Sequence, residues 1–333
     1  MTALKKLALL LLAVAAVLFA PCAFAQSAAP EKITIAQFGK ERFLLYLPLY
    51  VAMEEGLFKK RGLDVDLKFA GNDDQIFAAV VSGAAQFGMG DPVFTAISHD
   101  KGGPGKVVAM MLTKLDLAGV TNEDKIHEIK TPQELDSLRI SSFPEPSTTY
   151  TYLNQLKHKE CPNLTIVQAP VGGQMSLLEA GKVDIALDLE PTISIYEDKG
   201  YRIVVDITPW TDPQAVTGIT TTEEEIRNHP QTAQKVVDAL QEAVNLLYSD
   251  LAVGFQVGKK LYPQLSDKVV HSAVNRMLGA KMYPRSIVVA DDLWQRTIKT
   301  RLDSGELKKP QATSVAVDNE FALQAQKDLV AGK

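Results

Sequence analysis

The segment from Pro48 to Leu67, PLYVAMEEGLFKKRGLDVDL, constrains the fold most, because it carries the signals of a helix followed by those of a strand. Pro48 suits the first helical position, where its missing N–H is not needed, and Gly62 suits the left-handed residue after a helix end. Beyond Gly62 the pattern alternates, with Val65, Leu67 and Phe69 on one face and charged residues between them. The segment therefore predicts a helix that ends before Gly62 and a strand that follows it.

Another short strand is predicted just upstream, at Ile33–Phe38. The chain from 33 to 69 then forms a strand–helix–strand unit, with parallel strands and a right-handed crossover. Residues Gly39–Leu47 follow the first strand at its carboxyl end, which is the edge where open α/β sheets bind their ligands. In this loop we expect Phe43 and Tyr46 either to form an apolar wall against a ligand or to pack beneath the helix.

The run LPLYVAMEEGLFKKRGLDVDLKF, residues 47–69, resembles the opening signature of the periplasmic substrate-binding proteins of ABC importers. The branch it resembles includes the taurine, alkanesulfonate, nitrate, bicarbonate and thiamin-pyrimidine (NMT1/THI5-like) binders. The resemblance covers most of residues 32–230. It implies an α/β fold of the periplasmic-binding-protein-like type II class, in which two doubly wound lobes are joined by two hinge crossings. It also implies capture of a small-molecule ligand by hinge closure and delivery to an inner-membrane permease with a cytoplasmic ATPase.

The first 25 residues have the pattern of a secretory signal peptide. Two lysines precede an apolar run, Leu7–Ala20, which is shorter than the ~20 residues of a membrane span. Ala23–Ala25 fits a small-x-small cleavage site. We expect a mature chain that begins near Gln26 and is free in the periplasm. A retained membrane anchor and a lipoprotein attached through Cys22 are the alternatives.

Composition is that of a globular chain. The 333 residues are 46% hydrophobic, enough for a full core in about two domains of roughly 150 residues each. Cleavage takes two lysines from the 35 basic residues and none of the 40 acidic ones, which leaves a net charge of −7. No basic patch predicts nucleic-acid binding. We expect a monomer whose partners are a small molecule and a permease.

Two crossing segments divide the predicted chain. Charges replace the apolar pattern after Lys114, and a strand predicted at Ala215–Thr220 brings the chain back. We place the crossings near Leu117–Asn122 and Val216–Thr221. The predicted lobes are 26–118 with 219–333, including C-terminal helices that cover its sheet, and 119–218.

Two stretches share one order of features. Gln75–Pro92 and Gln174–Pro191 each run through a glutamine, a predicted helix, a glycine, a short strand, an acid and a proline. Two similar halves explain this order, although any α/β unit can produce it. The acids after the strands, which are Asp91, Asp188 and Glu190, would bring negative charge to loops that face each other across the lobes. Such charge suits amines or ring N–H donors and opposes a small free anion; alternatively these acids only cap the following helices.

Ser147, Thr148 and Thr149 begin another predicted helix. Several hydroxyls together with the unpaired N–H groups of a helix N-terminus suit an anionic or strongly accepting group. The resemblance implies that a turn of this kind holds the polar head of the ligand, whereas plain N-capping needs Ser147 alone. In front of the second Glu-Pro pair the chain has Leu189 where tryptophan is common in the family. The candidate ligand-binding residues are Phe43, Tyr46, Asp91, Ser147, Thr148, Thr149, Gln174, Asp188 and Glu190.

Signals of catalysis are weaker than those of binding. The five histidines are scattered, and neither an H-E-x-x-H motif nor a G-x-S-x-G motif occurs. We therefore expect no catalytic residue, no metal and no cofactor. A secreted enzyme on the same fold and a soluble ligand sensor for a membrane receptor are the alternative functions. The ligand class stays open among sulfonates, carboxylates, inorganic anions and aminopyrimidines.

Overall fold

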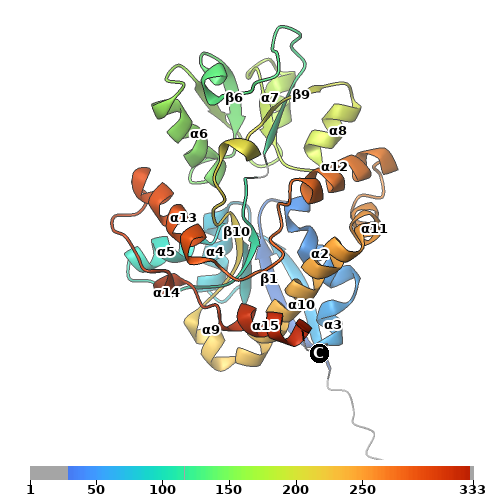
Figure 1. Cartoon of the computed structure of the whole chain (residues 1–333), viewed down its shortest axis with the longest axis vertical. Helices are drawn as coiled ribbons and strands as arrows, with labels where there is room; N and C mark the ends of the chain where they lie inside the picture. The colour runs from blue at the N-terminus through green and yellow to red at the C-terminus, as the bar shows by residue number, and fades with distance from the viewer. Residues whose placement is uncertain (1–28, 116, 331–333) are drawn as a thin grey trace, which may run out of the picture. The chain divides into compact units, whose positions relative to one another are not determined.

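A computed structural model describes residues 29–115 and 117–330. The predicted signal peptide and Cys22 lie outside these residues. From Glu31 onward the chain forms two α/β lobes, each built on its own sheet (Figure 1), as the resemblance implied. No helix in the described ranges is long and apolar enough to cross a membrane.

The first sheet has five strands. They are β1 (Glu31–Gln37), β2 (Leu63–Phe69), β3 (Phe87–Gly90), β4 (Lys106–Leu112) and β10 (Thr217–Thr221). Their order across the sheet is β2-β1-β3-β10-β4. β1 is parallel to β2 and β3, whereas β10 runs antiparallel to β3 and β4. The carboxyl ends of β1, β2 and β3 therefore meet at one edge.

The strand–helix–strand unit at the start of the chain is confirmed, since β1 and β2 are parallel neighbours. The single helix expected between them is wrong. Gly56 has a left-handed backbone with φ 68° and divides the segment into α2 (Leu47–Glu54) and α3 (Leu57–Lys60). In β2, Phe69 is 40% exposed, because it is the last residue of an edge strand and extends beyond the covered face.

The second sheet contains three antiparallel and two parallel strands. They are β5 (Ala118–Thr121), β6 (Arg139–Ser142), β7 (Thr165–Gln168), β8 (Ala186–Asp188) and β9 (Arg202–Asp206). β5 lies between β8 and β9, and β6 pairs with β7. A parallel bridge between Ile140 and Ile185 and a hydrogen bond from the Leu187 N–H to the Ser141 hydroxyl (2.9 Å) join the two groups.

The two lobes repeat one topology. With the bridge, the second sheet has the order β7-β6-β8-β5-β9, which corresponds position by position to β2-β1-β3-β10-β4. In each sheet the fourth strand is antiparallel to both of its neighbours. Each lobe thus receives its fourth strand directly after the chain has crossed from the other lobe, which agrees with the repeated order of features in the sequence.

The crossing segments lie next to the expected ones. Most of 117–122 and of 216–221 is strand, namely β5 and β10, so the chain passes between the sheets after β4 and before β5, and again after β9 and before β10. β5 was not predicted, because its sequence AGVT contains a glycine and an alanine and has no clear period. It is nevertheless fully buried, as a central strand between two neighbours must be.

Helices flank both sheets. Besides α2 and α3, the helices that precede β10 in the chain are η1 (Leu44–Tyr46), α4 (Asp73–Val81), α5 (Val93–Asp100), η2 (Pro132–Leu135), α6 (Thr148–Lys159), α7 (Gln174–Glu179), α8 (Thr192–Asp198) and η3 (Thr208–Trp210). The C-terminal ones are α9 (Glu223–Asn228), α10 (Pro230–Ser249), α11 (Leu251–Leu261), α12 (Asp267–Gly279), α13 (Asp291–Asp303), α14 (Thr313–Ala316) and α15 (Glu320–Val330). α10 packs between α2 and α15, and α15 contacts β4. The C-terminal helices therefore complete the core of the first lobe.

We predict that Gly119→Ala destabilises the protein by about 1–3 kcal/mol, the usual result of overpacking. A Cβ atom at this position would lie 2.4 Å from Cγ1 of Val205 and 2.6 Å from Cγ2 of Ile185, both in the core of the second lobe. Gly279→Ala is the control, because nothing lies within 4 Å of its added Cβ. Urea unfolding of both variants checks the prediction, and equal stabilities would contradict it.

Candidate functional site

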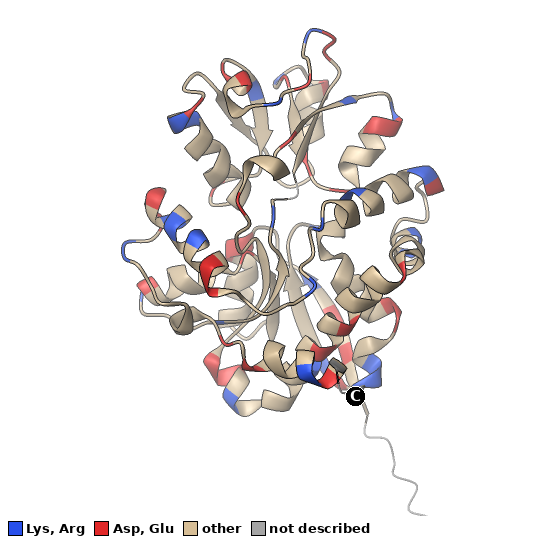
Figure 2. Cartoon of the chain, in the orientation of Figure 1, with Lys and Arg blue, Asp and Glu red and all other residues tan. Residues whose placement is uncertain are grey.

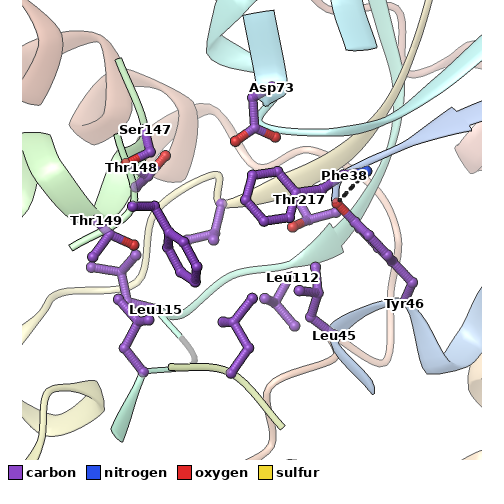
Figure 3. Close-up of a pocket in the computed structure, with 14 residues that line it drawn as sticks. Phe38, Leu45, Tyr46, Asp73, Leu112, Leu115, Ser147, Thr148, Thr149 and Thr217 are labelled. Carbon is purple, nitrogen blue, oxygen red and sulfur yellow. Dashed lines mark hydrogen bonds between the residues drawn. The ribbon is translucent and has the colours of Figure 1, made fainter. Parts of the chain in front are cut away.

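A cavity opens where the strands of both sheets end. The free space in which the centre of a water molecule can lie is ≈ 70 Å³. Its lining comes from both lobes and from the crossings (Figure 3): Phe38, Leu45, Tyr46, Asp73, Leu112, Leu115, Leu117, Phe143, Ser147, Thr148, Thr149, Leu189, Val216 and Thr217. Such a position, at the carboxyl ends of the strands, is the usual ligand edge of an open α/β sheet.

The cavity walls are mainly apolar. Phe38 follows β1 and Phe143 follows β6, and their rings meet edge to face with centroids 5.6 Å apart. This pair joins the two lobes beside the cavity. Five leucines and Val216 complete much of the remaining wall. The walls suit an apolar body, and the few polar groups among them would orient it.

The N-terminus of α6 supplies a polar edge. The Ser147 hydroxyl accepts a hydrogen bond from the Tyr150 N–H (3.2 Å), so Ser147 is the N-cap. The peptide N–H groups of Thr148 and Thr149 belong to the first turn, where no carbonyl of the helix can accept them, and the helix dipole adds partial positive charge there. Thr149 is buried and lines the cavity.

Asp73 brings a carboxylate to the cavity from the first turn of α4. Asn72 caps this helix together with Gln75, and Oδ1 of Asp73 accepts a hydrogen bond from the Asp91 N–H (2.8 Å). Figure 3 shows the carboxylate directed toward the other lining residues. Burial, and after it the nearby charge of Asp91, raise the pKa of Asp73 to about 7.

Tyr46 presents a neutral phenol on the same wall. Its oxygen accepts a hydrogen bond from the Phe38 N–H (3.3 Å), which fixes the loop after β1 against η1. Burial, with the charge of Asp73 as the next cause, raises the pKa of Tyr46 well above its ordinary value. The hydroxyl therefore keeps its proton at any physiological pH.

Arg301 of α13 links the lobes on one side of the cavity. Its side chain is 2% exposed and donates to Asp91 (2.5 Å) and Glu306 (2.6 Å) of the first lobe. It also donates to the hydroxyls of Thr148 (3.0 Å) and Thr151 (2.9 Å) on α6 of the second lobe. Thr148 in turn donates to Asp91, and Thr151 to Glu306 (2.8 Å).

Arg276 of α12 makes a second link between the lobes. It donates to Glu190 (2.6 Å) and to Glu197 (2.9 Å) at the two ends of the segment that forms α8. The carbonyl of Glu190 also accepts a hydrogen bond from the Leu44 N–H (3.0 Å). Burial raises the pKa of Glu190, although Arg276 acts in the opposite direction. Lys268 adds an exposed contact to Asp198 (2.7 Å).

Of the nine candidate residues, the structure brings Tyr46, Ser147, Thr148 and Thr149 to the cavity. Asp91 lies next to it but faces Arg301, and Glu190 faces Arg276 and caps α8 through Ser194. The other three, Phe43, Gln174 and Asp188, are buried away from the lining.

Each of these three buried residues interacts with a residue close to it in the sequence. Phe43 packs on Phe38 with ring centroids 6.2 Å apart. Gln174 donates to the carbonyl of Ala169 (3.1 Å). Asp188 accepts a hydrogen bond from the Leu189 N–H (2.8 Å), and burial raises its pKa to about 7. Phe43 thus packs in the core, which is one of the two roles expected for it.

Sequence reasoning missed Asp73, Arg301 and the pair Phe38 and Phe143. Asp73 follows the second strand at the ligand edge, and this position was a usable signal, although the run Asn-Asp-Asp there also predicts a helix cap. Arg301 gives no local signal, because it lies 210 residues from Asp91 along the chain. No group of three His, Cys, Asp or Glu side chains in the described ranges is arranged as a metal site.

A model of the family described as NMT1/THI5 like matches residues 45–250, more than half of the chain. The chain belongs to the NMT1/THI5-like family. This family comprises solute-binding proteins of ABC import systems. A curated relative of this NMT1/THI5-like chain is YtlA of Bacillus subtilis strain 168, provisionally named a binding protein. It is 23% identical over 315 residues, which cover 92% of this chain and 93% of YtlA.

Solved structures share the fold of this NMT1/THI5-like protein. The alkanesulfonate-binding protein SsuA from Xanthomonas axonopodis pv. citri, bound to MOPS, has a TM-score of 0.68 at 16% identity and covers 88% of this chain and 99% of its own. The desulfurization enzyme DSZB has a TM-score of 0.65 at 15% identity, with 90% of this chain and 99% of its own covered. These likenesses confirm the type II periplasmic-binding-protein fold.

We predict that Arg301→Met lowers the free energy of unfolding by about 3–5 kcal/mol, because it leaves Asp91 and Glu306 without their buried countercharge. Arg296→Met on the same helix is the control. Its side chain is 40% exposed and pairs with Asp292 at 2.8 Å, so its loss should cost at most about 1 kcal/mol. Urea unfolding measures both, and similar losses would refute the structural role of Arg301.

Asp188 should make stability fall as the pH rises. Its pKa of about 7 lies above the ordinary 3.8, so between pH 4 and 7 the folded state holds more protons than the unfolded state, and stability decreases through this window. Asp188→Asn should therefore change little at pH 4 and stabilise above pH 7, by about 4 kcal/mol at most.

Asp184 gives a control of opposite sign. Its hydrogen bond with Arg139 lowers its pKa, so Asp184→Asn should destabilise most at neutral pH and least in acid. Thermal or urea unfolding from pH 4 to 8 compares the two variants. If both show the same trend with pH, the expectation for Asp188 is wrong.

Proposed function

We propose that this protein is the periplasmic solute-binding component of an ABC-type importer. It holds a small organic molecule between its lobes and delivers the molecule to an inner-membrane permease that a cytoplasmic ATPase drives. The observation that carries the proposal is the cavity, because its lining comes from both lobes and from both crossings. Membership of the family and the signal-peptide pattern of residues 1–25 support the transport role and the compartment.

Closure of the lobes is the mechanism. Phe38 meets Phe143, and Thr148 meets Asp91, only when the second lobe lies against the first. A ligand in the cavity touches both lobes in this arrangement and only one of them when the lobes separate. It therefore binds the closed state more tightly and shifts the population toward it. The segments that join β4 to β5 and β9 to β10 would act as the hinge, between a first lobe built on β1–β4 and β10 and a second lobe built on β5–β9.

The walls of the cavity favour an organic ligand over an inorganic ion. A bare nitrate or bicarbonate ion needs several polar donors around it, whereas this cavity has leucine, valine and phenylalanine on most of its sides. The first-turn N–H groups of α6 and the Thr149 and Thr217 hydroxyls would fix one polar group of the ligand. No cysteine, lysine or histidine lines the cavity in the described ranges, and binding without turnover is the role proposed.

A thermal-shift panel tests the function. The mature chain from Gln26 is mixed with sulfonates, aromatic carboxylates, nitrate, bicarbonate and aminopyrimidines. A ligand at one hundred times its Kd adds about 2.7 kcal/mol, which is several degrees at roughly 2–4 °C per kcal/mol. Small-angle scattering should then show a smaller radius of gyration with the ligand. Conversion of the ligand to a product would instead establish an enzyme.

We further predict that Thr149→Val weakens binding of the panel ligand at least tenfold and leaves the unfolding midpoint nearly unchanged, because the side chain keeps its shape and loses only the hydroxyl. Thr165→Val, at an exposed position of β7, is the matched control and should bind normally. Titration calorimetry measures both. Normal affinity in Thr149→Val would remove this hydroxyl from the site.

A further inference from the structure

Asp73 is the acid that faces the cavity. It is the lone acidic residue among the described residues of the lining, and no lysine, arginine or histidine accompanies it there. Its Oδ1 accepts the Asp91 N–H, while its Oδ2 has no hydrogen-bond donor within the part of the chain that the structure describes. One carboxylate oxygen is therefore available to a ligand.

The neighbouring arginine attracts the charge of Asp73 without pairing with it. Arg301 directs its two terminal nitrogens at Asp91, Glu306 and two threonine hydroxyls, and no ion pair joins it to Asp73. The pair Arg301–Asp91 brings one positive and one negative charge, so it adds no net positive charge next to the cavity. A free anion in the cavity would meet the Asp73 carboxylate without a lining countercharge.

The second polar group of the cavity, the N-terminus of α6, presents hydrogen-bond donors, whereas Asp73 presents an acceptor. The first turn of α6 presents N–H donors and the positive end of the helix dipole. A ligand that spans the cavity thus meets an acceptor at Asp73 and donors at Thr148 and Thr149. Between these two ends the walls are apolar.

We infer that the ligand carries a proton-donating nitrogen, as in an amine, amidine or amino-heterocycle, and that Asp73 selects it by accepting this N–H and rejecting free anions. This inference rests on the proposed function and narrows its ligand class. It sets the chain apart from the relative whose structure holds a sulfonate, MOPS. Because the pKa of Asp73 is about 7, both protonation states of this carboxyl group occur near neutral pH. A donor N–H favours the ionised state.

Three probes with one benzyl body test the inference: benzylamine, benzyl alcohol and phenylmethanesulfonate. Their dissociation constants are measured at pH 8 by ligand-observed NMR titration with the mature protein, with Asp73→Asn and with Asp74→Asn. Asp74 is the matched control, since it is the next residue of α4, carries the same charge and is exposed. Benzyl alcohol reports on the fold, because its binding needs no charge.

Wild-type protein and Asp74→Asn should bind benzylamine at least tenfold more tightly than phenylmethanesulfonate. In Asp73→Asn this preference should fall below threefold, with benzyl alcohol bound as before. Equal or tighter binding of the sulfonate by the wild type, or a preference that survives in Asp73→Asn, would overturn the inference and leave the proposed binding function intact.

If the wild type binds none of the probes, it is incubated with a bacterial cell extract and unfolded, and the released compounds are weighed in H₂O and D₂O. A retained compound with exchangeable N–H groups, lost in Asp73→Asn, supports the inference. A retained compound without such groups overturns it but supports the binding function. Retention of no compound overturns the proposed function itself.

Discussion

The buried guanidinium of Arg301 is the interaction on which the arrangement around the cavity depends. A charge without access to water needs charged and polar partners in fixed places. The two terminal nitrogens of Arg301 contact two carboxylates in its own lobe and also donate to two hydroxyls of α6, a helix of the other lobe. The bonds to the hydroxyls form only when α6 lies against α13. Closure is specific in geometry because a displaced α6 would leave buried donors without acceptors.

The internal repeat of the fold explains where two of the predicted acidic residues lie and why each of them contacts an arginine. Asp91 and Glu190 both follow the third strand of their sheets and both precede a proline. Each accepts hydrogen bonds from an arginine of the C-terminal helices, Arg301 or Arg276. These two acids hold the lobes together, and their charge is balanced before a ligand arrives. Figure 2 shows acidic and basic residues interspersed along the outer helices, so the unbalanced carboxylate of Asp73 is a local feature of the cavity.

Local signals in the sequence predicted the parts of the fold that local physics determines. Gly62 ends a helix and alternation marks β2, so the first unit could be predicted, and with it the edge where Tyr46 and Ser147–Thr149 meet. β5 could not be predicted, since its small residues are explained only by the neighbours Val205 and Ile185 that crowd them. Arg301 could not be predicted either, because a buried ion pair between distant segments leaves no periodicity in the chain. Asp73 was open to two interpretations, and only the geometry of the closed lobes separates a helix cap from a cavity wall.

The unpaired oxygen of Asp73 connects ligand binding to closure. In the closed arrangement this carboxylate is partly buried and lies near Asp91, and both burial and the Asp91 charge raise its pKa. Separation of the lobes would let water solvate it, so in the empty cavity Asp73 opposes the closure that Arg301 favours. A ligand that donates an N–H to Asp73 and accepts from α6 removes this disadvantage and contacts both lobes at once. A ligand that contacted one lobe alone would bind the open and closed states equally and could not shift their populations, however tightly it bound.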